Sequence, residues 1–203
     1  LFIAKFNLLN LWKVWFFISI VVVLTIALTV FVNQYIALIL SVLAAYFKIV
    51  RPNIIIHNIS ELFIYGGLAS IFVTSLNILS ISILIILIAI YDMYAVWKSK
   101  HMVKLAKFQS KMKVFPGLLV PYTDKRKGKI AMLGGGDIGF PLIFSAVVFV
   151  KLGLISLIIP LVVALSLFLL LYYSEKNKFY PAMPFLGAGC FIGYFLVLGL
   201  TLI

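Results

Sequence analysis

The sequence predicts an all-α protein, a polytopic bundle of transmembrane helices. Hydrophobic residues make up 65% of the 203 residues and charged residues 11%, whereas soluble domains contain roughly 45–50% apolar residues. The mean hydropathy is +1.25. The apolar residues also gather in long runs, and a helix of about 20 apolar residues is long enough to cross a bilayer core.

The apolar runs predict about seven spans. They lie near residues 14–32, 34–47, 61–77, 78–97, 131–150, 152–173 and 181–203. No cleavage pattern of a signal peptide follows the first run, so we interpret it as a retained helix. The chain begins with Leu1 rather than Met, and we therefore expect it to be a piece of a longer protein.

One transmembrane domain, residues 1–203, is expected to hold all of these spans. Its expected parts are the N-terminal spans at 1–97, a loop at 98–129 and the C-terminal spans at 130–203. In the loop, residues 98–113 place apolar residues among lysines, which suits a helix lying on an anionic membrane surface. Residues 114–129 contain prolines and glycines typical of turns, with room for a short strand. A solvated loop that only marks topology is an equally good interpretation.

The basic residues predict the orientation of the chain, because lysine and arginine gather on the cytoplasmic side of membrane proteins. With seven spans, every basic residue except Lys151 falls on one side. The loop 98–129 is then cytoplasmic and the C-terminus lies outside, in a multi-pass protein of the cell membrane. The net charge of +12 therefore indicates topology, and no nucleic-acid partner is expected, because the aromatic residues lie within the apolar runs.

Two aspartates stand inside apolar runs of a chain that has only five acidic residues. Asp92 lies in ISILIILIAIYDMYAVW, and Asp137 lies in AMLGGGDIGFPLIFSAVVFV. A carboxylate at bilayer depth costs at least a few kcal/mol, so such residues usually face a protein interior or a wet cavity and have a function. Counted from Lys98 and Lys129, helical rise places the two aspartates about 9 Å and about 12 Å below the cytoplasmic boundary.

The similar depth of Asp92 and Asp137 indicates that their carboxylates act as a pair. Two carboxylates in a low-dielectric site tend to share one proton. One can then act as a base toward a water while the other donates a proton to a carbonyl oxygen, as in aspartic proteolysis. The predicted chemistry is hydrolysis of a peptide bond with no metal, no cofactor and no covalent intermediate.

Residues beside the aspartates favour this chemistry. Gly134, Gly135 and Gly136 remove side chains just before Asp137, and such a run weakens a helix interior but permits close approach of another chain. The last span begins with Pro181, Ala182 and Met183, followed by another proline. The imino acids favour an extended entry, with which an unwound substrate could pair as an added strand.

At these residues the chain resembles the presenilin and signal peptide peptidase family of intramembrane aspartyl proteases, and most of all its archaeal presenilin homologues. The motifs are Tyr91-Asp92 within YDMYAV, the GGGD that ends at Asp137, and Pro181-Ala182-Met183 within PAMPFLGAG. The resemblance implies that Asp92 and Asp137 are the catalytic residues. It also implies that the glycines and Tyr91 support the active site and that Pro181 to Met183 bind substrate, a transmembrane helix of another protein in the lipid bilayer.

The chain departs from the family pattern in two ways. Met183 stands where the family usually has leucine, which is a volume-conserving exchange. The family has nine spans, so the expected seven imply that two leading helices are missing. The expected cytoplasmic loop matches the presenilin orientation rather than that of signal peptide peptidases, which implies substrates whose N-terminus lies outside. Nothing in the residues specifies an accessory subunit or an oligomeric state.

Two other functions remain open from the residues. A proton- or cation-coupled transporter or channel would use the same intramembrane aspartate pair, and a prepilin-peptidase-like protease shares the G-x-G-D motif. The single Cys190 and the two histidines make a metal site improbable. His57 and Glu61 lie at a span end, where we expect solvated groups without a role, and Gly189 and Gly193 are expected to pack closely against another helix.

Overall fold

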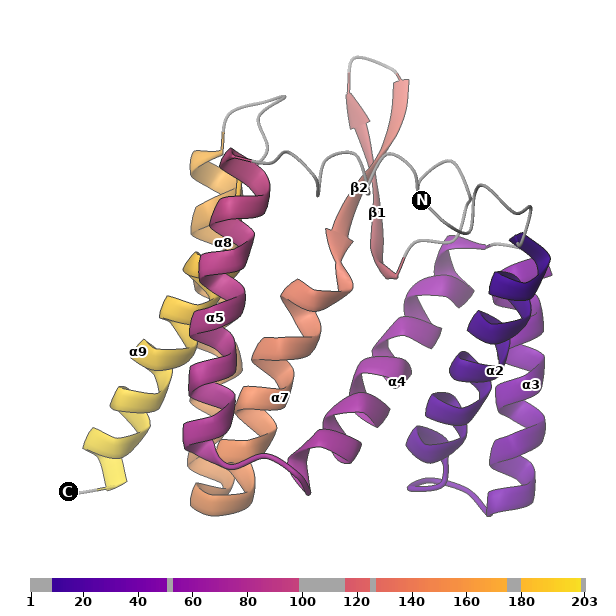
Figure 1. Cartoon of the computed structure of the whole chain (residues 1–203), viewed down its shortest axis with the longest axis horizontal. Helices are drawn as coiled ribbons and strands as arrows, with labels where there is room; N and C mark the ends of the chain where they lie inside the picture. The colour runs from indigo at the N-terminus through magenta and orange to yellow at the C-terminus, as the bar shows by residue number, and fades with distance from the viewer. Residues whose placement is uncertain (1–8, 51–52, 99–115, 125–126, 175–179, 202–203) are drawn as a thin grey trace. The chain divides into compact units, whose positions relative to one another are not determined.

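The computed structural model describes residues 9–50, 53–98, 116–124, 127–174 and 180–201 (Figure 1). The chain divides into two compact units, which are described separately. One contains Leu1–Leu68 and Pro116–Leu133, and the other contains Ala69–Phe115 and Gly134–Ile203. The expectation that residues 1–203 form a single protease domain stays a prediction. The helix expected on the membrane surface at 98–113 lies outside the described residues, apart from Lys98.

The first unit contains helices and a β-hairpin. Its elements are α2 (Leu9–Leu28), α3 (Gln34–Val50), most of α4 (Ile54–Val73), and strands β1 (Gly117–Asp124) and β2 (Lys127–Gly134), which pair with each other. Ile20, Leu24 and Ala45 form its small buried apolar cluster. The short strand that the sequence permits within residues 114–129 is present as β1, and it forms a hairpin with β2.

The second unit is a bundle of α5 (Ile78–Trp97), α7 (Gly135–Leu152), α8 (Ile158–Tyr173) and α9 (Met183–Thr201). Phe144 of α7 is fully buried at its centre. The Phe144 ring meets the rings of Phe191 and Tyr194 edge to face, with centroids 5.8 and 6.1 Å apart, which is a favoured geometry for aromatic pairs. The helices α5 and α8 run in one direction and α7 and α9 in the other (Figure 1).

The chain turns back between α7 and α8 through a short 3-10 helix, Gly153–Leu157. Gly153 has a φ of 69°, a left-handed conformation that glycine adopts at little cost. The apolar helical stretch Gly135–Tyr173 is 39 residues long, and as one straight helix it would measure about 58 Å, nearly twice a bilayer core. The turn at Gly153 divides it into two helices of membrane-spanning length.

The number of membrane crossings stays a prediction, although each expected apolar run overlaps a helix. The span expected at 131–150 begins too early, because residues up to Gly134 belong to β2 and α7 starts at Gly135. Among the described residues, four helical stretches are long and apolar enough to cross a membrane: Ile54–Val73, Ile78–Trp97, Gly135–Tyr173 and Met183–Thr201. The apolar parts of α2 and α3 are shorter. The expected span at 61–77 was placed too late, because α4 begins at Ile54 and carries polar residues whose partners the sequence does not reveal.

The glycines of α9 confirm the expected close packing of helices. A methyl group at Gly189 would lie 2.6 Å from the Ser166 hydroxyl oxygen, and one at Gly193 would lie 3.0 Å from the Ile159 Cα atom, both on α8. Gly187 faces α5 instead, where a methyl group would lie 2.9 Å from Ile85. Small residues on α9 therefore let two neighbouring helices approach its backbone.

Candidate active site

Asp92 is buried near the C-terminal end of α5, with 7% of its surface exposed. Its Oδ2 accepts a hydrogen bond of 3.1 Å from the backbone N–H of Met183, the first residue of α9. The backbone N–H of Ala182 donates to the same carboxylate. The first N–H groups of a helix lack partners within the helix and carry partial positive charge. Asp92 therefore occupies an anion-binding position at the N-terminus of α9.

The prolines on either side of Ala182 and Met183 explain why the backbone N–H groups of these two residues are the ones that interact with Asp92. Pro181 and Pro184 have no N–H to donate, so Ala182 and Met183 supply the available donors at this helix end. Pro184 is tolerated because its missing N–H falls in the first turn, where the group would have no helical partner. Pro181 and Met183 are both buried. The backbone from Tyr180 to Ala182 is non-helical, with a bend at Ala182, and the extended entry stays a prediction.

Asp137 is the third residue of α7, and Gly134 is the residue before the helix, with φ −62° and ψ 142°. A methyl group at Gly134 would lie 3.0 Å from Asp137 Oδ2. The carboxylate of Asp137 therefore folds back over the bare backbone of Gly134. At Gly136 a methyl group would meet the Phe140 ring at 3.5 Å, an ordinary contact. Gly135, the first residue of α7, is half-buried.

The structure brings Asp92 and Asp137 to the same end of the second unit. Helix α5 contacts α7 and α9, and α7 and α9 begin beside the middle and upper part of α5 in Figure 1, below its last turns. Among the described residues, neither aspartate has a basic partner within ion-pair distance. Tyr91 is 57% exposed, and its supporting role stays a prediction.

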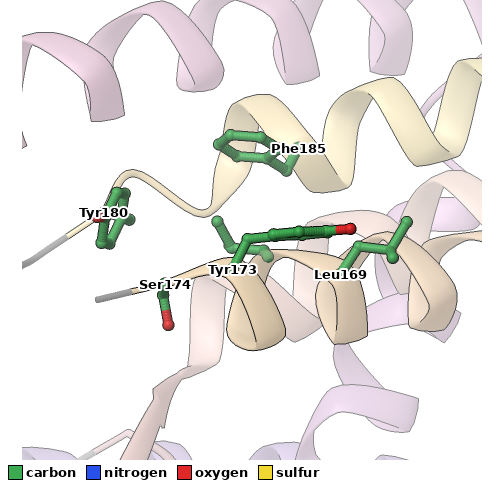
Figure 2. A pocket seen from close by; sticks show the side chains of 6 residues that line it. Leu169, Tyr173, Ser174, Tyr180 and Phe185 are labelled. Carbon is green, nitrogen blue, oxygen red and sulfur yellow. The ribbon is translucent and has the colours of Figure 1, made fainter. Parts of the chain in front are cut away.

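An apolar pocket of about 350 Å³ flanks the Pro181–Met183 segment. Figure 2 shows Tyr173 and Leu169 of α8 on one side, with Tyr180 and Phe185 on the other. Tyr180 immediately precedes the segment in the sequence and Phe185 follows it closely. The pocket is lined almost entirely by apolar atoms, so an apolar group fits it best.

In the described part of the chain, no group of three His, Cys, Asp or Glu side chains is placed to hold a metal ion. Cys190 is buried within the helix bundle.

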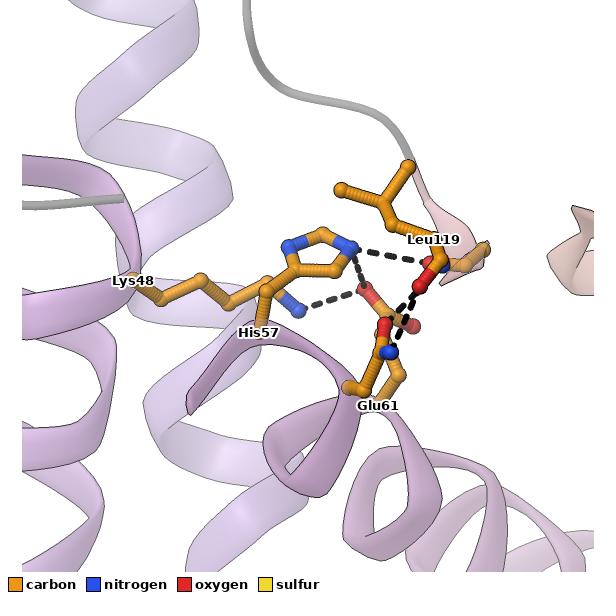
Figure 3. Close-up of polar contacts among 6 residues, drawn as sticks. Lys48, His57, Glu61 and Leu119 are labelled. Atoms are coloured by element: carbon orange, nitrogen blue, oxygen red, sulfur yellow. Dashed lines mark hydrogen bonds and ion pairs between the residues drawn. The ribbon is translucent and has the colours of Figure 1, made fainter. Parts of the chain in front are cut away.

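Sequence reasoning missed a buried polar cluster in the first unit. Glu61 is only 2% exposed, and its Oε1 pairs with Lys48 Nζ of α3 at 2.5 Å. His57 lies one turn before Glu61 on α4 and is also buried (Figure 3). The expectation of solvated groups at a span end was wrong for both residues. The available signal was the spacing of His57 and Glu61, four apart and therefore on one helix face.

The family model for signal-peptide peptidase and presenilin aspartyl proteases matches residues 1–201. The chain belongs to this family. It is similar to two structures of a presenilin-family intramembrane aspartate protease, one in the P2 space group and the other in the C222 space group. The first has a TM-score of 0.66 and 23% identity, covering 94% of this chain and 72% of that one. The second has a TM-score of 0.65 and 22% identity, covering 93% and 73%. Comparison with curated proteins finds no match.

Membership of the signal-peptide peptidase and presenilin family confirms the resemblance seen in the three motifs. Together with the apolar helices, it identifies the chain as an integral, multi-pass membrane protein with a polytopic helical fold. The cytoplasmic position of residues 98–129, the outer position of the C-terminus and the location in the cell membrane stay predictions.

Proposed function

We propose that this protein is an intramembrane aspartic endopeptidase that cuts peptide bonds within transmembrane helices of other membrane proteins. Asp92 and Asp137 are its catalytic residues. The observation that carries the proposal is that α5 and α7, which contact each other in an apolar helix bundle, carry two carboxylates, one bonded to the N-terminus of α9 and the other beside the bare backbone of Gly134. The family, whose members are aspartyl proteases, supports the same function.

The two environments suit different roles. The N–H of Met183 donates to Asp92 and offsets part of the cost of burying its charge, so we assign Asp92 as the carboxylate that takes a proton from the attacking water. Asp137 holds the proton shared by the pair and donates it to the carbonyl oxygen of the substrate. The water oxygen bonds to the carbonyl carbon to give a tetrahedral diol. The C–N bond then breaks, the leaving nitrogen receives the proton taken by Asp92, and a hydroxyl of the diol returns its proton to Asp137 as the new carboxyl group forms.

The remaining residues position the substrate in this proposal. Gly134, Gly135 and Gly136 keep side chains away from the approach to Asp137, so an unwound substrate backbone can come close. The segment Pro181–Met183 holds Asp92 and borders the substrate site. The pocket lined by Tyr180 and Phe185 receives an apolar side chain of the substrate helix.

The test is incubation of the purified protein in detergent with a single-span substrate, followed by mass analysis of the fragments. Cuts within the apolar segment are expected, and a transition-state analogue of aspartic proteases should block them. Asp92→Asn and Asp137→Asn should each abolish cleavage while the protein remains folded by circular dichroism. Cleavage that persists in both variants would remove the two aspartates from the chemistry.

An ion-coupled transporter or channel is the second candidate, because an intramembrane aspartate pair also suits proton or cation movement. The family match favours the protease over this function and over a prepilin-peptidase-like enzyme. Flux of protons or cations in vesicles, lost in the Asp92→Asn variant, would support the transporter if the parent protein cut no substrate.

A further inference from the structure

Two successive residues of α4 bind the backbone of strand β1 in the first unit. His57 Nε2 lies 2.8 Å from the carbonyl oxygen of Gly117 and donates to it, since a carbonyl only accepts. The Asn58 side chain donates to the Leu119 carbonyl at 2.8 Å and accepts from the Leu119 N–H at 2.9 Å. Figure 3 shows His57 and Leu119 facing each other across this contact.

These three hydrogen bonds recognise an extended backbone rather than side chains. Residues two apart in a strand present their backbone groups on the same edge, and Gly117 and Leu119 are such a pair. The amide of Asn58 reproduces the paired donor and acceptor of a neighbouring strand. One edge of β1 is therefore bound to α4 and the other to β2.

The charged groups behind this contact are difficult to explain by stability alone. Lys48, His57 and Glu61 are all buried, and replacing a buried ion pair with apolar residues is often neutral or stabilising. The carboxylate of Glu61 lies 4.0 Å from His57 Nε2 and is paired with Lys48. The pair thus keeps α3 and α4 together and keeps a carboxylate beside the ring that binds Gly117, which indicates a role in specifying a geometry.

The hairpin that contains β1 is followed directly in the chain by α7, which carries the proposed catalytic residue Asp137. Strand β1 pairs with β2, and β2 ends at Gly134. Gly134 is the residue before α7 and lies against the carboxylate of Asp137. A contact that fixes β1 therefore restrains the strand from which α7 starts.

We propose that His57 and Asn58 are positioning residues, which hold the β1–β2 hairpin so that Gly134 and Asp137 enter α7 in the geometry that catalysis needs. This inference rests on the proposed protease function. Neither residue is assigned a contact with substrate. Their removal should lower kcat more than it changes KM, because the substrate site is left in place while the geometry of the reacting groups relaxes.

The decisive variant is Asn58→Leu, which is close in size and loses all hydrogen bonds to Leu119. The kcat for cleavage of a reporter helix should fall on the order of 10- to 100-fold, the usual effect of a misplacement near 1 Å. Deuterium exchange in the peptide that contains Leu119 should become faster. The matched control is Asn53→Ala, because Asn53 caps the same helix end through the Ile55 N–H and makes no described contact with β1.

A second pair of variants tests His57 without relying on Asn58. His57→Phe removes the donor to Gly117, whereas His57→Gln retains an N–H at a similar distance along the side chain. The glutamine variant should recover most of the kcat that the phenylalanine variant loses. Normal kcat in Asn58→Leu and His57→Phe, despite faster exchange at Leu119, would overturn the proposal.

Failure of the proposed function gives a different result. If the parent protein cuts no substrate, the protease assignment itself is wrong and the positioning role is lost with it. If the parent is active and exchange at Leu119 is unchanged in Asn58→Leu, the contact between α4 and β1 is wrong while the protease assignment survives.

Discussion

The carboxylate of Asp92 lies 3.1 Å from the backbone nitrogen of Met183, ninety-one positions later in the chain. This one hydrogen bond joins α5 to the first residue of α9. Asp92 therefore has two roles: it is the proposed catalytic base, and its side chain accepts a hydrogen bond from the N-terminus of α9. The two prolines around Met183 limit the donors at this helix end, which ties the position of α9 to the presence of an acceptor at residue 92.

Substitutions of Asp92 should separate its role in catalysis from its role at the N-terminus of α9. Asp92→Asn retains an oxygen that can accept from Met183, whereas Asp92→Ala leaves the first amides of α9 without a side-chain partner. Both variants should be inactive toward a reporter helix. The alanine variant should be about 0.5–2 kcal/mol less stable than the asparagine variant, the usual value of a helix cap, as measured by unfolding in detergent.

Asn77 provides the control for this comparison. Its side chain accepts from the Ser80 N–H at the start of α5, whereas Asp92 lies near the other end of that helix. Asn77→Ala should lower stability by a similar amount but leave cleavage intact. Equal stability of Asp92→Ala and Asp92→Asn would mean that the bond to Met183 contributes nothing to the fold.

Gly134→Ala should impair catalysis without unfolding the protein. The backbone at Gly134 has φ −62° and ψ 142°, which any residue adopts. The added methyl group would lie 3.0 Å from Asp137 Oδ2, so the carboxylate must shift. We expect kcat to fall on the order of 10-fold or more, measured by single-turnover cleavage of a reporter helix.

Gly199→Ala is the control for Gly134→Ala, because a methyl group at Gly199 meets no atom within 4 Å. Its activity should match the parent. Full activity in Gly134→Ala would show that the carboxylate of Asp137 has room to adjust, and the close approach at Gly134 would then have no role in catalysis.

The helices and the aspartate pair were accessible from sequence because apolar runs, buried acids and glycine motifs are local signals. Long apolar segments can satisfy their backbone in a membrane only as helices or closed barrels, so the run around Asp92 predicted its helix well. The run around Asp137 predicted a helix that starts four residues too early, because the residues up to Gly134 pair with β1 in a hairpin. The distribution of lysines and the helical rise predicted a similar depth for Asp92 and Asp137.

The bond from Asp92 to Met183 and the cluster around Glu61 could not be predicted in the same way. Each joins residues from different elements, and a sequence does not give the distance between them. Glu61 was misjudged because a charge near a helix end is usually solvated, and nothing local shows that Lys48 covers it. The start of α4 was missed for the same reason, since its polar residues are partnered by α3 and β1.

Gly193→Leu should destabilise the second unit. The Cα atom of Ile159 would lie only 3.0 Å from the first added carbon, and a backbone atom cannot swing aside as the end of a side chain can. Overpacking of this kind typically costs about 1–3 kcal/mol, and it should appear as a lower unfolding temperature in detergent. Gly199→Leu on the same helix should unfold near the parent temperature, and a similar loss there would assign the effect to α9 in general rather than to its contact with α8.

The pair of Lys48 and Glu61 should show strong coupling in a double-mutant cycle. Both side chains are 3% exposed, so Glu61→Leu leaves a buried ammonium without its partner, and Lys48→Met leaves a buried carboxylate. Each single variant should lose about 3–5 kcal/mol of stability, while the double variant should be about as stable as the parent or more stable, because it no longer buries two charges.

The measurement is the free energy of unfolding of all four proteins, obtained by chemical unfolding in detergent. The losses of the two single variants should add up to far more than the loss of the double variant. Additive losses would mean that Lys48 and Glu61 act independently, and the ion pair between α3 and α4 would then contribute nothing of its own to the first unit.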